Sequence, residues 1–265
     1  MASIVQRTEE IRKQMERAGL SRIAPTVLKL LRPSIRLVVG EPSAQPVTRL
    51  GGGPNMPAGI AWPTRKSGDP HSFLAQIDLA RLGVCDGLAL PDTGSLFFFC
   101  DAEYLPESSD SRDVKDGIKV VYSPTSLSDN GVRTPPRGLN TEYVFKGFSF
   151  QPTLDMTAPA HGVWEIECLH LDDAESDAYG ELFAQVCAGD GSVHRIGGYP
   201  NLVQYRQLEF PADAGEANWQ LLLQLDSEED AGMMWGDVGR LYFVIREQDL
   251  KSLSFERAWI DWQCG

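Results

Sequence analysis

The sequence predicts an α+β protein, mainly antiparallel β, in which one structural unit occurs twice. The segment Arg-Leu-Gly-Gly-Gly-Pro-Asn-Met at 49–56 returns as Arg-Ile-Gly-Gly-Tyr-Pro-Asn-Leu at 195–202. Short apolar runs with a two-residue period alternate with turns rich in Gly and Pro, which is typical of antiparallel strands. Helical periodicity is confined to the N-terminus and to one acidic stretch.

Three further blocks follow the first one in the same order in both halves. The four matched pairs lie 146, 148, 148 and 145 residues apart: Arg49 and Arg195, Pro63 and Pro211, Gln76 and Gln224, Gly94 and Gly239. Offsets that drift so little are what duplication followed by small loop changes leaves. We therefore expect one domain with pseudo-two-fold symmetry, made of N-terminal helices (1–34), a first copy (35–122), a connecting insert (123–190) and a second copy (191–265).

Composition bounds the class of protein. The 265 residues, 42% of them hydrophobic, suffice for a sizeable core. A net charge of −13 argues against nucleic acid or an anionic membrane as partner, because phosphate binding needs clustered Lys and Arg. Five scattered cysteines indicate reduced thiols. The charged first 20 residues lack a secretory signal, and no apolar run could span a bilayer, so we expect a cytoplasmic protein.

The N-terminal elements are read from periodicity. Ile4, Ile11, Met15 and Ala18 share one helical face, and Gly19 stops that helix. A second helix is expected from about 21 until Pro33 ends it, because proline cannot continue a helix. A strand follows at 34–39.

The first copy continues with a segment at 40–72 whose many Gly and Pro residues exclude helix. We expect Met56 and Trp62 to hold it against the core. Strands are predicted at 73–79, at 96–100 with both faces covered, and at 118–122. The polar stretch 106–117 is predicted to be a surface loop.

The insert is predicted to contain strands at 143–150 and 163–171 and an acidic helix at 173–188. In the second copy, strands are expected at 221–226 and 241–245. The aromatic run Phe255, Trp259 and Trp262 predicts a last strand packed on the core.

Common catalytic and metal motifs are absent from the sequence. The run Gly51-Gly52-Gly53-Pro54 lacks the Gly-Lys-Ser/Thr ending of a phosphate loop and cannot open a helix. The four histidines have no zinc-ligand spacing, no cysteine has a nucleophile context, and no Gly-x-Ser-x-Gly elbow occurs. No cofactor is implied.

The repeated polar residues are the candidate site. Asp78, Asp92, Asp226 and Asp237 recur two per copy and could bind a hard cation or share acid/base work if they converged. The alternative is that Gln76/Asp78 and Gln224/Asp226 hydrogen bond to the backbone of the adjacent turns. The candidate ligand-binding residues lie at and beside these turns: Arg49, Gly52, Gln76, Asp78, Arg195, Gly198, Gln224 and Asp226. Replacing Gly52 or Gly198 with Val should cost about 1–3 kcal/mol if the turns need positive φ.

These blocks resemble one known family. The order Gly-Gly-x-Pro, Trp-Pro, Phe-Leu-x-Gln-Ile-Asp-Leu and Leu-Pro-x-x-Gly-x-Leu-Phe-Phe, followed by Gly-Gly-Tyr-Pro, Leu-Leu-Leu-Gln-Leu-Asp and Trp-Gly-Asp-x-Gly-x-Leu-Tyr-Phe, is similar to the YwqG-like family, a bacterial domain of unknown function. The similarity covers residues from about 35 to 265. It implies a soluble α+β domain with no established activity, cofactor or catalytic residues. The resemblance also implies an association of some relatives with toxin and immunity genes.

The leading functional hypothesis is a non-enzymatic protein-binding module, immunity-like toward a basic partner. The acidic runs at 171–177 and 226–232 would be its landing surface. The alternative is a small-ligand-binding or metal-dependent enzyme with a site at the Gly-Gly-Pro turns between the two copies. A third hypothesis is a purely architectural dimeric subunit.

Overall fold

A computed structural model describes residues 4–83, 88–105, 111–188, 191–204, 208–210 and 218–265. Its centre is a ten-stranded sheet in which all pairs are antiparallel, in the order β10-β9-β8-β7-β1-β6-β2-β3-β4-β5. The strands are β1 Arg32–Pro42, β2 Arg49–Leu50, β3 Ser72–Asp78, β4 Ser95–Cys100, β5 Ile118–Ser123, β6 Phe148–Thr157, β7 His194–Ile196, β8 Trp219–Asp226, β9 Arg240–Arg246 and β10 Trp259–Gln263. The predicted fold class is confirmed at this level.

The sheet curls into a nearly closed barrel whose interior is filled by apolar side chains. Phe98 of β4 meets Phe243 of β9 across that interior, with ring centroids 5.2 Å apart. The two ends of the sheet approach each other where Tyr122 of β5 packs on Phe255, at a centroid distance of 5.4 Å. Phe255 belongs to a 3₁₀ turn, η5 (Phe255–Arg257), which directly precedes β10. We call this junction between β5 and η5 the seam.

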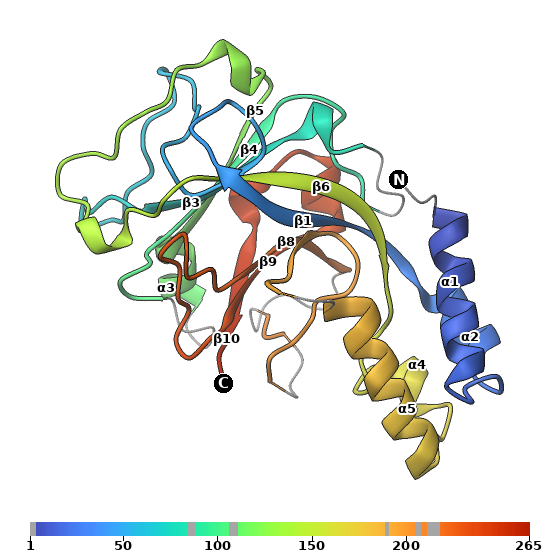
Figure 1. Cartoon of the computed structure of the whole chain (residues 1–265). Coiled ribbons are helices and arrows are strands. Elements are labelled where there is room, and N and C mark those ends of the chain that lie inside the picture. Colours follow the sequence, from blue (N-terminus) through green and yellow to red (C-terminus); the bar gives the residue numbers. More distant parts are fainter. Residues whose placement is uncertain (1–3, 84–87, 106–110, 189–190, 205–207, 211–217) are drawn as a thin grey trace.

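The two longest strands, β1 and β6, lie side by side at the middle of the sheet (Figure 1). β1 precedes β2 in the chain but pairs with β6 and β7, and β6 in turn pairs with β1 and β2. β1 therefore lies beside β7, although β2 follows it in the chain. β6 lies beside β2, although β7 follows it in the chain.

Four of the described helices, α1, α2, α4 and α5, gather on one side of the long strands (Figure 1). They form a second apolar cluster with Met156 and Ala158, to which α1 contributes Ile11 and Met15 and α5 contributes Tyr179. The helices are α1 Ile4–Arg17, α2 Ala24–Leu30, α3 Ser111–Gly117, α4 Trp164–Glu167, α5 Asp173–Phe183 and α6 Glu247–Lys251. No helix in the described ranges is long and apolar enough to cross a membrane.

Several predicted elements are confirmed. The N-terminal helices occupy the expected positions, and every residue of β4 is buried, as a strand covered on both faces requires. Met56 is buried, and Trp62 packs on Phe99 at a centroid distance of 5.4 Å while its indole Nε1 donates to the carbonyl of His71 at 2.9 Å. The Gly- and Pro-rich segment is thus held on the outer face of the sheet.

Three element predictions are wrong. The segment 163–171 is not a strand: α4 and turns occupy it, and only Ile166 is buried. The strand predicted at 143–150 begins at Phe148 and continues to Thr157, because its partner β1 extends that far. Residues 111–117 of the predicted surface loop form α3, and 106–110 lie outside the described residues.

Two other predicted elements differ in extent. The acidic helix runs as α5 to Phe183 and continues as a π-helical turn, Ala184–Ala188, while Gly189 is not described. Asp172 caps α5 in a capping box with Glu175, which explains why the helix begins where it does. The last strand is β10, but Phe255 lies in η5 before it.

Candidate functional site

The glutamines of the repeated blocks lie fully buried beside the Gly-Gly turns. The Gln76 amide nitrogen donates to the carbonyl of Val47 at 2.9 Å, and its oxygen accepts from the amide of Asn55 at 2.8 Å. Gln224 makes the corresponding bonds to Val193 at 2.6 Å and Asn201 at 2.8 Å. Both side chains therefore satisfy loop backbone groups that would otherwise be buried without partners.

The two arginines of the blocks are buried as well and bind carbonyl oxygens of the turns. The Arg49 guanidinium donates to Gln45 at 2.6 Å, to Gly51 at 3.3 Å and to Gly53. Burial lowers the pKa of Arg49 to about 10, so the group stays protonated at neutral pH. A guanidinium carries five donors in a fixed fork, which suits it to bridge several carbonyls of one turn.

Arg195 has the corresponding place in the second half. It donates to the carbonyl of Tyr199 at 3.4 Å and to that of Cys187. Burial lowers its pKa too. Both Gly-Gly turns are therefore tied down from the inside by a cation.

The two buried aspartates at the ends of β3 and β8 also have partners inside the protein. Asp226 accepts from the backbone amides of Val193 at 2.8 Å and Ser227 at 3.0 Å and pairs with Arg240 at 3.0 Å. Asp78 pairs with Arg81 at 3.3 Å, and burial raises its pKa against the opposing effect of Arg81.

His194 has a structural counterpart in the first half. Its Nδ1 accepts from the amide of Asp226 at 3.1 Å, where the hydroxyl of Thr48 accepts from the amide of Asp78 at 2.9 Å. The histidine Nε2 lies 3.8 Å from Glu228, and this neighbour is the main cause of the lowered pKa of Glu228.

The candidate residues of the two halves do not share one cleft. β6 and β1 separate β2 from β7, a spacing of about 14 Å across the sheet. Asp92 and Asp237 are exposed. Within the described ranges, no group of three or more His, Cys, Asp or Glu side chains could hold a metal ion. The geometry that a shared carboxylate site requires is therefore not found among these residues.

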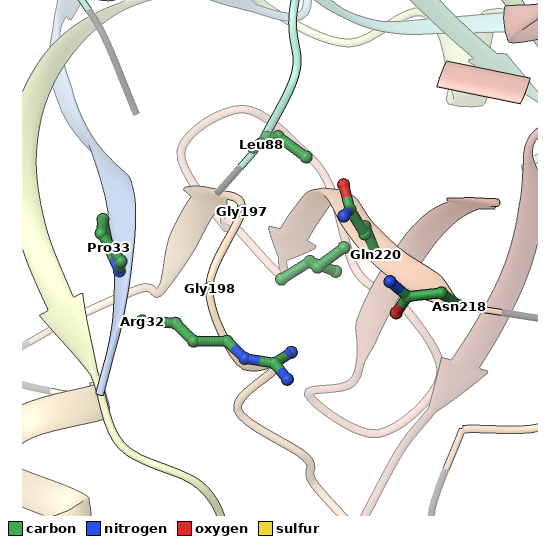
Figure 2. A pocket seen from close by; sticks show the side chains of 8 residues that line it. Arg32, Pro33, Leu88, Gly197, Gly198, Asn218 and Gln220 are labelled. Carbon is green, nitrogen blue, oxygen red and sulfur yellow. The ribbon is translucent and has the colours of Figure 1, made fainter. Parts of the chain in front are cut away.

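One candidate residue, Gly198, borders a pocket of about 250 Å³ at the second Gly-Gly turn. Figure 2 shows the Arg32 guanidinium and the Asn218 side chain extending toward each other across it, with Gln220 beside them. Arg32 also lies over the ring of Tyr199, 4.3 Å from its centroid. No carboxylate in the described part of the chain pairs with Arg32, so this pocket offers a cation and two amide side chains.

A larger pocket, of about 610 Å³, lies at the seam. Its floor is the strand β5, and its walls are the loop with Ile60 and Trp62 on one side and the segment with Leu253 and Phe255 on the other. Sequence reasoning missed it, because the two walls are almost 200 residues apart in the chain.

The third feature is electrostatic. Residues 147–194 contain nine Asp and Glu and no Lys or Arg, so they carry −9 of the net charge of −13. Six of these carboxylates are exposed on or beside α4 and α5: Glu165, Glu167, Asp172, Asp173, Asp177 and Glu181. Trp164, 73% exposed, lies at the start of α4 among them. We call these six carboxylates and Trp164 the acidic face.

The fold and these features define a class of protein: an antiparallel, nearly closed ten-stranded sheet with α1, α2, α4 and α5 packed together on one side. The chain belongs to the DUF1963 family, a domain of unknown function, whose model matches residues 48–264. The YwqG-like resemblance is compatible with this membership. The match includes β2 to β10 and leaves out α1, α2 and β1. No curated protein matches the chain.

Proposed function

We propose that the chain is a non-enzymatic protein-binding module whose acidic face docks a basic partner protein. The observation that carries the proposal is the concentration of most of the net charge in one segment without Lys or Arg. Surface charge of one sign steers a complementary partner and raises its association rate by 10-fold or more at low salt.

The exposed tryptophan supports docking at this face. A large aromatic side chain at the centre of an interface is a frequent anchor of binding. An immunity-like protein would use such a face to cover a basic enzyme.

Affinity capture with charge variants tests the proposal. The face variant carries Glu167→Gln, Asp173→Asn, Asp177→Asn and Glu181→Gln, which spares the capping residues of α5. A control variant with the same net charge carries four exposed substitutions elsewhere: Asp92→Asn, Asp129→Asn, Glu142→Gln and Asp237→Asn. We expect a basic partner that wild type and control retain at low salt and release at high salt, and that the face variant loses. Equal capture by both variants, or no specific partner at any salt, would contradict the proposal.

The pocket of Figure 2 supports a second candidate function, the binding of a small carboxylate. A guanidinium held over an aromatic ring is pre-oriented for a carboxylate, and amide side chains can complete its hydrogen bonds. Calorimetric titration with acetate, succinate and citrate tests it. Binding that Arg32→Gln abolishes would support it, and no heat with any of the three would exclude it.

We also propose that the two halves arose by duplication and that the protein works in the cytoplasm. The paired bonds of Gln76 and Gln224 and the bulges at Leu74 and Leu222 support duplication, since unrelated halves would have no reason to match in both. The position of β6 opposite β1 suggests that the second copy starts at β6. Four free cysteines, at 100, 168, 187 and 264, support a reducing compartment.

A further inference from the structure

The strand β5 has an open edge at the seam. In the sheet β5 pairs with β4 alone, and the amide of Asp101 donates to the carbonyl of Gly117 at 2.7 Å in register with that ladder. Backbone groups of an antiparallel strand point alternately to its two sides. Lys119, Val121 and Ser123 therefore direct theirs toward β4, while Ile118, Val120 and Tyr122 direct theirs to the open edge.

These three residues present six backbone hydrogen-bonding groups to the seam. The amides and carbonyls of Val120 and Tyr122 bond to no other backbone or side-chain group of the described residues, whereas the Ile118 amide directly follows the last turn of α3. The pocket of about 610 Å³ runs along all five residues from Ile118 to Tyr122, a length of about 16 Å at the rise of a strand. The edge is therefore unpaired and also has free volume beside it.

The opposite edge of the sheet is covered by the chain itself. There the amide of Gln204 donates to the Gln263 side chain at 3.0 Å and the amide of Glu209 to Asp261 at 3.3 Å, so Gln204 and Glu209 lie beside β10. On the β5 side, the segment 60–64 instead forms a wall of the pocket. An edge strand flanked by a chain segment is thus already a feature of this fold.

We propose that the seam binds an extended peptide segment of another protein, which adds as a strand to β5. Strand addition takes its affinity from main-chain hydrogen bonds and its specificity from pockets for alternate side chains. Side chains of the guest on one face meet Trp62 and Ile60, and those on the other meet Phe255 and Leu253. The guest is therefore a short uncharged segment rich in β-branched residues, without proline at the paired positions.

A buried histidine belongs to the wall of the pocket. His71 is 2% exposed and lines the pocket, and its Nε2 donates to the carbonyl of Asp116 at 2.8 Å. Among the described residues, its Nδ1 has no hydrogen-bond partner. This site shares no residue with the acidic face and does not depend on it.

Selection from a phage-displayed library of linear heptapeptides, followed by fluorescence anisotropy with the enriched peptides, tests the proposal. Val120→Pro removes an edge donor without touching the ladder to β4, whereas Val120→Ala loses the same side-chain packing and keeps the amide. We expect enriched apolar, β-branched peptides that bind wild type and Val120→Ala within about threefold, and Val120→Pro at least tenfold more weakly.

Two further measurements distinguish strand addition from binding at the acidic face and from binding without main-chain hydrogen bonds. Binding should persist at 0.5 M salt and in the face variant, so loss of the basic partner leaves this result intact. A peptide N-methylated at its paired positions should not bind. Equal binding of the N-methylated peptide, equal binding by Val120→Pro, or no enrichment at all would overturn strand addition at this edge.

Discussion

Replacing Gly198 with Ala is the sharpest test of how the Gly-Gly turns are built. Gly198 has φ +70°, and a Cβ there would lie 2.4 Å from the Thr157 hydroxyl and 2.9 Å from Ser34 Cβ. That hydroxyl accepts from the amide of Tyr199 at 2.9 Å and donates to the carbonyl of Arg32 at 3.0 Å. The substitution therefore strains the backbone, overpacks the site and displaces a bridging hydroxyl.

The magnitude follows from these three effects. A left-handed conformation costs a non-glycine residue about 1–2 kcal/mol, overpacking costs about 1–3 kcal/mol, and a displaced hydrogen bond costs about 1 kcal/mol. We expect a loss of about 3–6 kcal/mol in the free energy of unfolding. At about 2–4 °C per kcal/mol for a chain of this size, the melting temperature should fall by about 6–24 °C.

Two matched glycines separate backbone strain from packing. Gly19 has φ +78° and nothing within 4 Å of its Cβ position, so Gly19→Ala should cost only the strain. Gly52 has φ +72° with Gly147 Cα at 3.2 Å and Arg49 Nε at 3.3 Å, so Gly52→Ala should lie between the two. Urea unfolding of the three variants measures the order. Equal losses at all three positions would refute the reasoning, because packing would then contribute nothing.

Three other predictions concern the buried glutamines, the protonation of His71 and the pairing of β1 and β2 with β6. Gln76→Leu and Gln224→Leu should each cost about 2–5 kcal/mol in urea unfolding, because each leaves a buried amide and a buried carbonyl unpaired; a loss below 1 kcal/mol would contradict this. Burial lowers the pKa of His71, so the unfolded chain binds more protons below pH 6.5 and stability should fall as the pH drops from 7 to 5. His71→Gln should flatten that fall, and His170→Gln, at an exposed residue, should not. The fragment 1–130 should not fold on its own, because β1 and β2 would lose their partner strand β6. Circular dichroism measures this, and a cooperative thermal unfolding of the fragment would contradict the prediction.

Much of the local structure was predictable from sequence because burial on one or both faces leaves a periodic signal. The repeated blocks also placed Gln76 and Gln224 in corresponding surroundings. The prediction of a strand at 163–171 was wrong, because Trp164, Ile166 and Cys168 have the alternating spacing of a strand although only Ile166 is buried. Residues with that spacing are compatible with a strand or a single helical turn, and tertiary contacts decide between them.

Long-range features left no such signal. Nothing local to β1 indicates that it pairs with β7 instead of β2, since strand pairing depends on the whole sheet. The seam pocket depends on loops that are distant in sequence for the same reason. The acidic face differs, because counting Lys and Arg between 147 and 194 would have found it.

The central position of β1 and β6 and the open edge of β5 both follow from the topology of the sheet. β1 and β6 pair with each other, β1 also pairs with β7, and β6 also pairs with β2, so these two strands connect the two halves of the sheet. β5 and β10 are then the two edge strands of the sheet. An unpaired edge is prone to unwanted pairing unless it is covered. Gln204 and Glu209 of the chain itself bond to side chains of β10, whereas β5 stays open in a recess between two apolar walls. A recessed edge admits a single extended chain and excludes another folded sheet, which is the selectivity that a peptide site needs.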